Sequence, residues 1–386
     1  MKFIREALDD LLEAGLYRRM HTVTHRKGAC IRIGEKDLVS FASNDYLGLS
    51  EHPEIIEASR AATEQSTGTG ASRLVQGNTT LHEELEQKIA RFYKTEDSLV
   101  FPTGYMANIG IISALMEDDD VIISDELNHA SIIDGCRLAG ATVSVYDHKD
   151  LAMLEQALEE YTLSPKTLII TESLFSMDGD VAPLQKIVAL AKKHNAMTLV
   201  DDAHAIGVLG ESGRGGLEMS GVEGEVDFVM GTLSKTLGAM GGFAAGSADF
   251  INYLRNRARS FIFTTSLPAG VCAAASKAID IIETNSRPRE KLWKNVRYFK
   301  KTLRTAGIRP MCEETNIIPI VIGDANETLA CAAKLLAAGL FVPAIRPPTV
   351  PEGSSRLRIA ITAAHSTENI DALTAALQKI AVEKIQ

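Results

Sequence analysis

Several features are scarce in this sequence, and each shortage narrows the kinds of protein it can be. Among its 386 residues there is one tryptophan, and the five cysteines are scattered without a C-x-x-C pair. Disulfide frameworks and zinc sites need regularly spaced cysteines, so we expect reduced thiols in a cytoplasmic protein. Spacings typical of other metal sites, such as H-E-x-x-H, do not occur. The sequence therefore predicts no bound metal.

Positive charge is also in short supply. The 40 Lys and Arg residues are outnumbered by 50 Asp and Glu, which gives a net charge of −10. An acidic chain without a basic run argues against nucleic acid or an anionic membrane as the main partner. One uncharged run, residues 98–116, contains Pro102 and Gly110, which predicts a strand, a turn and a buried helix rather than a membrane span. The residues before Met20 predict an amphipathic helix and not a signal peptide.

The chain does have a regular alternation of apolar runs and amphipathic stretches. Its 45% hydrophobic and 23% charged residues are typical of a globular protein, and its length suggests roughly two to three domains. From about residue 98 to residue 246, short β-branched runs alternate with helical patterns, which predicts a mostly parallel sheet covered by helices. The predicted strands are 98–101, 121–124, 142–146, 167–171, 197–200 and 227–231.

The pattern changes near residue 286. Beyond it, residues 317–322 and 356–361 predict strands, and their alternation predicts a sheet with one solvated face, as in an α+β domain. Composition does not decide which domain receives the strand-like residues 29–33 and 38–42. The expected organisation is an N-terminal segment over 1–45, a large domain over 46–285 and a small domain over 286–386.

Polar side chains follow four of the predicted strands at their carboxyl ends, where ligands bind to an open α/β sheet. Asp201 and His204 follow one strand and Lys235 follows another, while His129 and the turn at Gly104 follow two more. Taken singly, each has a plain structural explanation, as a helix cap, a satisfied histidine or a solvated lysine. Lys235, however, lies in a loop of small residues. Together the set predicts a functional site at one edge of the sheet.

This set fits one coenzyme better than it fits the common nucleotide motifs. A P-loop needs glycine immediately before its lysine, where this chain has Ser234, and the segment from Gly68 neither follows a clear strand nor completes G-x-G-x-x-G. Pyridoxal phosphate needs a lysine for its aldehyde, a carboxylate for its ring nitrogen and donors for its phosphate. Lys235 and Asp201 meet the first two needs. The candidates for the phosphate are Gly104, Tyr105, Thr232 and Ser234.

These residues lie in blocks that resemble the α-oxoamine synthases, a family of pyridoxal phosphate enzymes of the aspartate-aminotransferase fold (fold type I). The blocks are Ser43–Leu49, Gly104–Asn108, Asn128–Ser131, Glu172–Asp180, Asp201–Gly207, Gly231–Lys235 and Ala363–His365. The resemblance implies a large domain with a mostly parallel sheet plus a smaller α+β domain. It also implies a homodimer with active sites at the subunit interface, and a reaction that condenses an amino acid with an acyl thioester and releases CO₂.

The same resemblance implies roles for single residues. It assigns Lys235 to the Schiff base with the coenzyme aldehyde, and it makes this lysine the base that removes the Cα proton. The other assignments are Asp201 to the ring nitrogen, His204 to the ring oxygen, His129 to stacking on the ring, Ser176 to the cofactor and Glu172 to the substrate side. The segment 264–266 either reaches the cofactor of a partner subunit or caps a buried strand at 261–263.

The block Ala344–Pro351 resembles the family members that join L-alanine to a pimeloyl thioester in biotin biosynthesis. This likeness assigns Arg346 to the amino-acid carboxylate, which suits the planar guanidinium, with Asn44 and Thr349 as further substrate ligands. Arg346 is also explained as a surface arginine stiffened by two prolines. The alternative substrates are glycine and acetyl-CoA. The residues leave open whether the pimeloyl group arrives on CoA or on acyl carrier protein.

Overall fold

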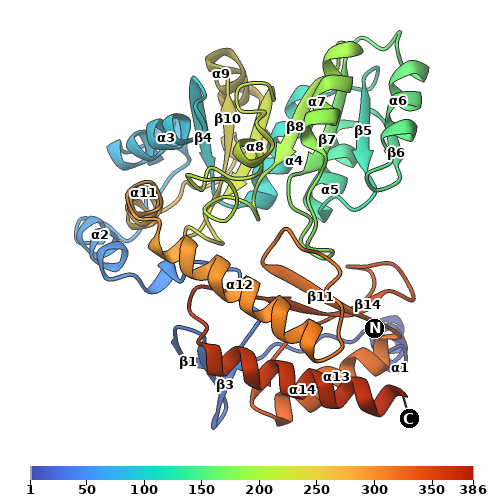
Figure 1. The fold of residues 1–386 in the computed structure, drawn as a ribbon. Coiled ribbons are helices and arrows are strands. Elements are labelled where there is room, and N and C mark those ends of the chain that lie inside the picture. The colour runs from blue at the N-terminus through green and yellow to red at the C-terminus, as the bar shows by residue number, and fades with distance from the viewer. Residues whose placement is uncertain (1, 386) are drawn as a thin grey trace. The chain divides into compact units, whose positions relative to one another are not determined.

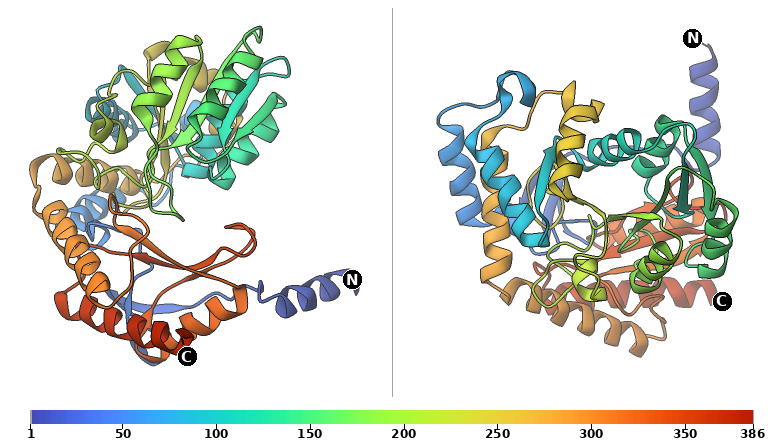
Figure 2. Two further views of the ribbon diagram at one scale, coloured as in Figure 1. Left: turned by 45° about the vertical axis from the view of Figure 1, so that its right-hand side comes forward. Right: turned by 90° about the horizontal axis from the view of Figure 1, so that it is seen from above.

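The computed structural model describes residues 2–385, with side chains as far as Ala381. The chain forms two compact units. The small unit contains the residues up to Gly48, the segment Ser176–Asp180 and the residues from Arg287 onward, whereas the large unit contains Leu49–Phe175 and Val181–Ser286. The N-terminal residues, which composition does not assign to a domain, therefore share a unit with the C-terminal residues (blue and red in Figures 1 and 2).

A seven-stranded sheet forms the centre of the large unit, in the order β4-β10-β9-β8-β7-β5-β6. Strands β9, β8, β7, β5 and β6 are parallel to one another, and β10 is antiparallel to both of its neighbours. The six predicted strands and the mostly parallel sheet are confirmed. The strands span Asp97–Phe101 (β4), Val121–Asp125 (β5), Thr142–Tyr146 (β6), Thr167–Glu172 (β7), Met197–Asp201 (β8), Phe228–Thr232 (β9) and Gly242–Gly246 (β10).

Strand β10 is the member of this sheet that the sequence pattern does not predict. Its residues, Gly-Phe-Ala-Ala-Gly, include no β-branched side chain, so local propensity gives no strand signal. The small residues have a packing reason instead. A Cβ atom on Gly242 would lie 2.5 Å from the Cα atom of Gly104, so glycine is what allows the start of the helix at Gly104 to approach the sheet.

Helices surround this sheet (Figure 1). α4 contacts β9 and β10, α7 contacts β8, and α3 contacts β4 and β10. The helices span Pro53–Thr63 (α2), Thr80–Tyr93 (α3), Gly104–Leu115 (α4), Ala130–Ala139 (α5), Leu151–Glu160 (α6), Leu184–Lys193 (α7), Gly216–Ser220 (α8), Ala248–Arg257 (α9), Arg259–Ile262 (α10) and Ala269–Thr284 (α11). A 3₁₀ turn at Leu49–Glu51 (η1) and a π-helical turn at Arg73–Gly77 (η2) complete the unit.

Two expectations about apolar runs have different outcomes. Residues 98–116 form β4, a turn and α4, as predicted, and none of the described helices is long and apolar enough to cross a membrane. The strand considered at 261–263 is wrong, because these residues form the end of the helix α10 (Arg259–Ile262) and its C-cap, Phe263. A short apolar run fits either structure, and here the ring of Phe261 packs edge-on against Phe101, with centroids 5.8 Å apart.

The small unit contains two sheets, which makes it an α+β unit. Strands β1, β2 and β3 form an antiparallel meander to which β12 adds in parallel, and β11, β14 and β13 form an antiparallel sheet. Its strands span Val23–Lys27 (β1), Cys30–Ile33 (β2), Lys36–Ser40 (β3), Ile317–Gly323 (β11), Leu340–Phe341 (β12), Ala344–Ile345 (β13) and Ser355–Ala360 (β14). Its helices span Lys2–Glu13 (α1), Arg287–Thr305 (α12), Ala325–Ala337 (α13) and Thr367–Ile385 (α14).

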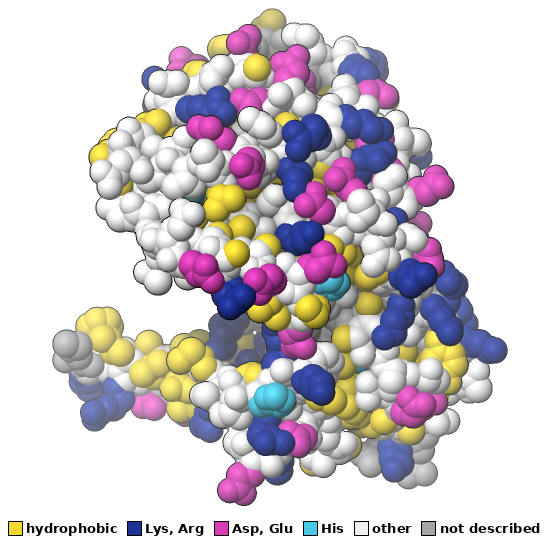
Figure 3. Space-filling view, turned by 90° about the vertical axis from the view of Figure 1, so that its left-hand side faces the viewer, with side chains coloured by type: hydrophobic (Ala, Val, Ile, Leu, Met, Phe, Trp, Pro, Cys, Tyr) yellow, Lys and Arg dark blue, Asp and Glu magenta, His cyan; other side chains and the backbone are white. Residues whose placement is uncertain are grey.

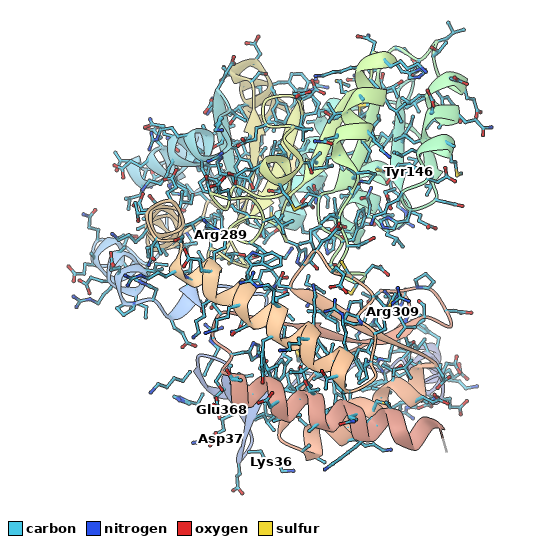
Figure 4. All side chains as sticks on the ribbon, in the orientation of Figure 1. Lys36, Asp37, Tyr146, Arg289, Arg309 and Glu368 are labelled. Atoms are coloured by element: carbon cyan, nitrogen blue, oxygen red, sulfur yellow. The ribbon has the colours of Figure 1, made fainter. Side chains whose placement is uncertain are left out.

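Solvent-facing parts of the chain carry charges of both signs. Asp37, labelled in Figure 4, pairs with Arg32 across β2 and β3, with 2.7 Å between Arg32 Nε and Asp37 Oδ1. On the face drawn in Figure 3, acidic and basic side chains are interspersed. The helix α1 is amphipathic, as predicted, and contains no buried residue.

The predicted solvated face of β14 is wrong. All six of its residues are buried, including Arg356 and Arg358 at the alternate polar positions. The segment Ser176–Asp180 supplies their partners: Arg356 Nη1 lies 2.6 Å from Asp178 Oδ1, and Arg358 Nε lies 2.6 Å from the carbonyl oxygen of Ser176. A segment from the middle of the chain thus covers the face that alternation alone assigns to water.

Two fully buried histidines are neutral because of their burial, and backbone groups bind both nitrogens of each ring. In the large unit, His82 Nδ1 accepts from the Thr79 N–H and Nε2 lies 3.0 Å from the Leu267 carbonyl oxygen. In the small unit, His365 Nδ1 accepts from the Thr362 N–H and Nε2 lies 3.0 Å from the Ser40 carbonyl oxygen. Burial lowers the pKa of each histidine to about 4.

We expect stability to fall in acid because of these two histidines. Their pKa is about 6.5 in the unfolded chain and about 4 in the folded one, so between these values the unfolded chain binds more protons. The free energy of unfolding therefore decreases as the pH falls from 6.5 to 4, by on the order of 3 kcal/mol per histidine. Urea titrations over this range should show a shallower pH slope for His82→Gln and His365→Gln than for the parent protein. Equal slopes would contradict the assignment.

Candidate active site

The carboxyl ends of β7 and β8 place two acidic side chains next to each other. Glu172 and Asp201 are the last residues of these strands and are partners in the parallel register. Both are buried. Asp201 Oδ2 accepts a hydrogen bond from Asn108 Nδ2 at 2.8 Å, and Oδ1 accepts one from the backbone N–H of Ala203 at 3.0 Å. The predicted ring-nitrogen ligand is thus a buried, hydrogen-bonded carboxyl group.

The neighbourhood of Asp201 changes the acidity of Glu172. Burial raises the pKa of Glu172 well above its usual value, and the negative charge of Asp201 raises it further. The charge of Lys235 and the backbone N–H of His129, which donates to Glu172, oppose this shift. Glu172 therefore keeps its proton to a higher pH than an ordinary glutamate.

The second acid of the Asp-Asp pair points away from the first. Asp202 is fully buried, and its carboxylate accepts hydrogen bonds from Tyr93 (2.8 Å), Ser173 (2.5 Å) and the backbone N–H of Gly216 (2.9 Å). Sequence reasoning leaves open whether both acids face the site. The structure answers this, because successive side chains of an extended segment point to opposite faces. Asp202, the residue after β8, instead binds the end of α3, the residue after β7 and the start of α8.

His129 lies at the edge of the site, at the N-cap position of α5. Its Nδ1 accepts from the backbone N–H of Ser131 and lies 2.8 Å from Ser131 Oγ. The Tyr105 ring meets the imidazole edge-on, with centroids 6.2 Å apart. His129 is exposed, which leaves it accessible to a planar ligand. The predicted stacking residue is therefore available for that role.

The loop after β9 contains Lys235. Thr232 Oγ1 donates to the carbonyl oxygen of Gly241 at 2.8 Å and lies 2.8 Å from Ser234 Oγ, which ties the two ends of the loop together. Lys235 is half-buried, and its charge lowers the pKa of both His129 and Glu172. The lysine is therefore electrostatically close to both groups. His204, beyond the end of β8, is buried.

The start of α4 provides a place for an anion. Thr103 caps this helix by accepting from the Met106 N–H, and Gly104 and Tyr105 begin it. The N–H groups of a first turn have no acceptor within their own helix and bind phosphates well. A Cβ on Gly104 would lie 3.4 Å from Thr232 Oγ1, so the helix start and the Lys235 loop are neighbours. The four predicted phosphate ligands thus belong to two adjoining segments.

These groups fit pyridoxal phosphate. The large unit combines an amine on a loop, a buried carboxyl group, an accessible imidazole and a helix start with two adjacent hydroxyl groups. They match the coenzyme's aldehyde, ring nitrogen, ring face and phosphate in turn. Close packing of Gly104 and Gly242 keeps side chains out of the helix start. The chemistry of this donor set therefore agrees with the coenzyme.

A second polar group lies in the small unit. Arg358 is buried, and its Nη2 lies 3.2 Å from Asn44 Oδ1 and 3.3 Å from Tyr46 Oη. Its Nε donates to the carbonyl oxygen of Ser176. Two predicted site residues, Asn44 and Ser176, are thus brought together by an arginine that the sequence reasoning does not select. The signal that could have found it is the pair of arginines, Arg356 and Arg358, at alternate positions of a largely apolar strand.

Arg346 and Thr349 lie elsewhere in the same unit. Arg346 Nη1 donates to the carbonyl oxygen of Gly15, and Thr349 Oγ1 lies 3.5 Å from Arg18 Nη2. Burial lowers the pKa of Arg346, and the nearby charge of Arg18 lowers it further. The partner of Asn44 is therefore Arg358 and not Arg346, the arginine with which the sequence groups it.

Asn108 and Ser131 also escape the sequence reasoning. Both are buried, and together they connect Asp201 with His129. Each stands at the end of a block quoted for the family resemblance, Gly104–Asn108 and Asn128–Ser131. Asn108 lies one helical turn beyond Gly104 and so faces the same way. This spacing was the signal that could have found it.

Comparison with known proteins agrees with this geometry. The family model described as aminotransferase class I and II matches residues 36–377. The 8-amino-7-oxononanoate synthase of Geobacter metallireducens is 47% identical over 384 residues, with 98% of each chain covered. The 8-amino-7-oxononanoate synthase 2 of Bacillus subtilis is 46% identical, with 99% of this chain and 98% of the relative covered.

Solved structures show the same fold. A serine palmitoyltransferase from S. paucimobilis, with a bound pyridoxal phosphate–myriocin adduct, has a TM-score of 0.94 at 35% identity and covers 99% of this chain and 97% of its own. The 8-amino-7-oxononanoate synthase of Francisella tularensis has a TM-score of 0.79 at 25% identity, with 90% and 99% covered. The chain therefore belongs to the aminotransferase class I and II family and, within it, to the pyridoxal phosphate-dependent α-oxoamine synthases.

Proposed function

We propose that this enzyme condenses L-alanine with a pimeloyl thioester, with release of CO₂ and the free thiol, to give 8-amino-7-oxononanoate. The observation that carries the proposal is the near-full-length similarity to 8-amino-7-oxononanoate synthases, at 43–47% identity. The site of the large unit supports it, since it contains the groups that a pyridoxal phosphate-dependent condensation needs. A homodimer in the cytoplasm is part of the proposal.

Each residue of the large unit has a proposed task. Pyridoxal phosphate, when bound, supplies an aldehyde for the amino acid and a ring that takes up the electron pair released at Cα. The Lys235 amine removes the Cα proton of alanine and returns a proton later in the reaction. Asp201 holds a proton on the ring nitrogen, His204 donates to the ring oxygen, and His129 covers the ring. The helix start at Gly104 and Tyr105 binds the phosphate together with Thr232 and Ser234.

Residues of the small unit are proposed to bind the substrate or the cofactor. Arg346, Asn44 and Thr349 are the proposed ligands of the amino-acid carboxylate, and Ser176 is a proposed cofactor ligand. Arg358 joins this proposal because it already donates to Asn44, and because a buried guanidinium with several donors can bind a carboxylate through two of them.

A parallel assay tests the substrates. The purified enzyme should release CO₂ and free thiol from L-alanine with a pimeloyl thioester much faster than from glycine with acetyl-CoA. Supplying the pimeloyl group on CoA and on acyl carrier protein compares the two possible donors. A preference for glycine with acetyl-CoA would reject the proposed substrates and leave the coenzyme assignment intact.

Lys235→Ala should remove the amine that the chemistry requires. We expect the turnover number to fall by at least about 10³-fold, the range of a lost general acid–base group, while the melting temperature changes little because the side chain is half-buried in a loop. Borohydride treatment of the parent enzyme should attach the coenzyme to Lys235. Lys186→Ala, on the exposed face of α7, is the matched control. Unchanged turnover in Lys235→Ala would refute this assignment.

Asp201→Asn and Asp202→Asn form a matched pair, because both acids are buried and adjacent. Asp201→Asn should lower the turnover number about 10- to 100-fold, since it weakens a charge-assisted hydrogen bond to the ring nitrogen. Asp202→Asn should instead lower the free energy of unfolding by about 1–3 kcal/mol, since its carboxylate accepts three hydrogen bonds within the protein. Steady-state kinetics and urea unfolding of both variants make the comparison. Lost turnover in Asp202→Asn together with lost stability in Asp201→Asn would contradict these assignments.

A further inference from the structure

A short chain of hydrogen bonds connects Asp201 with His129. Asn108 Nδ2 lies 2.8 Å from Asp201 Oδ2 and 2.9 Å from Ser131 Oγ, and Ser131 Oγ lies 2.8 Å from His129 Nδ1. The two linking residues are each 1% exposed, so water does not compete for these contacts. The chain joins α4, α5 and the end of β8, and every member belongs to the large unit.

The amide group of Asn108 can adopt only one of its two orientations. If its oxygen faced Asp201, two acceptors would meet without a proton between them. The nitrogen therefore faces the carboxylate, and both of its protons are used, one toward Asp201 and one toward Ser131. Ser131 Oγ is accordingly the acceptor in its contact with Asn108.

Ser131 in turn determines which nitrogen of His129 carries the proton. In the described part of the chain, the acceptor left for the Ser131 hydroxyl proton is His129 Nδ1. The backbone N–H of Ser131 is directed at the same nitrogen, with 3.3 Å between the two nitrogen atoms. Two donors aimed at Nδ1 require a lone pair there. In the other neutral tautomer and in the imidazolium, Nδ1 carries a proton. That proton would point at the hydroxyl and N–H protons of Ser131, which is unfavourable.

We propose that Asn108 and Ser131 are positioning residues, which hold His129 as the neutral tautomer with its proton on Nε2 and link its orientation to that of Asp201. The surrounding charges agree with a neutral ring. Partial burial lowers the pKa of His129, and the charge of Lys235 lowers it further, against the opposing effect of the Asp201 carboxylate. Glu172, whose own pKa is raised by burial, accepts the His129 backbone N–H.

A fixed tautomer gives His129 a defined function at the edge of the site. Its Nε2–H has no acceptor among the described residues, so it is available to a ligand. A neutral imidazole can also stack on a cationic heterocycle without charge repulsion, which an imidazolium cannot. This consequence rests on the proposed function, because it assumes that the ring covers pyridoxal phosphate. The tautomer itself depends only on the protein.

Nuclear magnetic resonance of the full-length protein with isotope-labelled histidine tests the tautomer directly, with and without coenzyme. The His129→Asn variant identifies the signals of His129. At neutral pH we expect Nδ1 to resonate as an unprotonated nitrogen and Nε2 as a protonated one. A protonated Nδ1 would overturn the proposal.

Variants test the positioning residues. In Ser131→Ala the two nitrogen signals should move toward each other, because the tautomers begin to exchange, and Asn108→Ala should cause a smaller shift in the same direction. Ser131→Thr keeps the hydroxyl and should restore the parent spectrum. Ser113→Ala is the control, because among the described residues its hydroxyl bonds only to the Ile109 carbonyl of its own helix. Unchanged signals in folded Ser131→Ala, or in folded Asn108→Ala, would overturn the role of that residue.

A separate measurement keeps this inference distinct from the proposed function. The dissociation constant of pyridoxal phosphate should rise about tenfold in Ser131→Ala, on the order of one weakened hydrogen-bonded contact. A parent protein with the expected tautomer that fails to bind the coenzyme would refute the proposed function alone. A parent protein that binds the coenzyme with Nδ1 protonated would refute the inference alone.

Discussion

The burial of the Asp201 carboxyl group at the end of β8 is the constraint on which the site depends. Removing a carboxylate from water is unfavourable unless protein donors replace the lost hydrogen bonds. Asn108 on α4 and the backbone N–H of Ala203 supply them. Because one of these donors comes from α4, the helix that begins at Gly104 must pack closely on the sheet, and Gly242 allows this approach. The anion-binding helix start and the buried acid are thereby fixed together.

Three histidines of this protein share one hydrogen-bonding arrangement. His82, His129 and His365 each accept a backbone N–H at Nδ1, which places the proton on Nε2 and favours the neutral ring. In His82 and His365, Nε2 lies within hydrogen-bonding distance of a buried carbonyl oxygen, and the residue serves the fold. In His129 the same arrangement occurs at an exposed position beside Lys235, where the remaining N–H is free for chemistry.

Much of the large unit could be predicted because its signals are local. Continuous apolar runs such as 121–123 in β5 and 168–170 in β7 fit strands buried on both faces, and the polar residues that follow them identify the edge of the sheet where ligands bind. Strand β10 could not be predicted in this way, because its glycines and alanines are chosen for close packing against α4 and not for strand propensity. The buried face of β14 was missed for a similar reason. Only the fold brings Ser176–Asp180 over Arg356 and Arg358.

The sequence by itself determined the class of fold, the coenzyme and the residue types at the strand ends, because hydrophobic periodicity and short motifs lie within a few residues of one another. The tertiary structure alone decided which groups become partners. It turned Asp202 away from Asp201, paired Asn44 with Arg358, and joined Asp201 to His129 through Asn108 and Ser131. Apart from the local contact between Ser131 and His129, these hydrogen bonds connect residues from 23 to 314 positions apart. Hydrogen bonds over such separations depend on how whole elements pack, which no local pattern encodes.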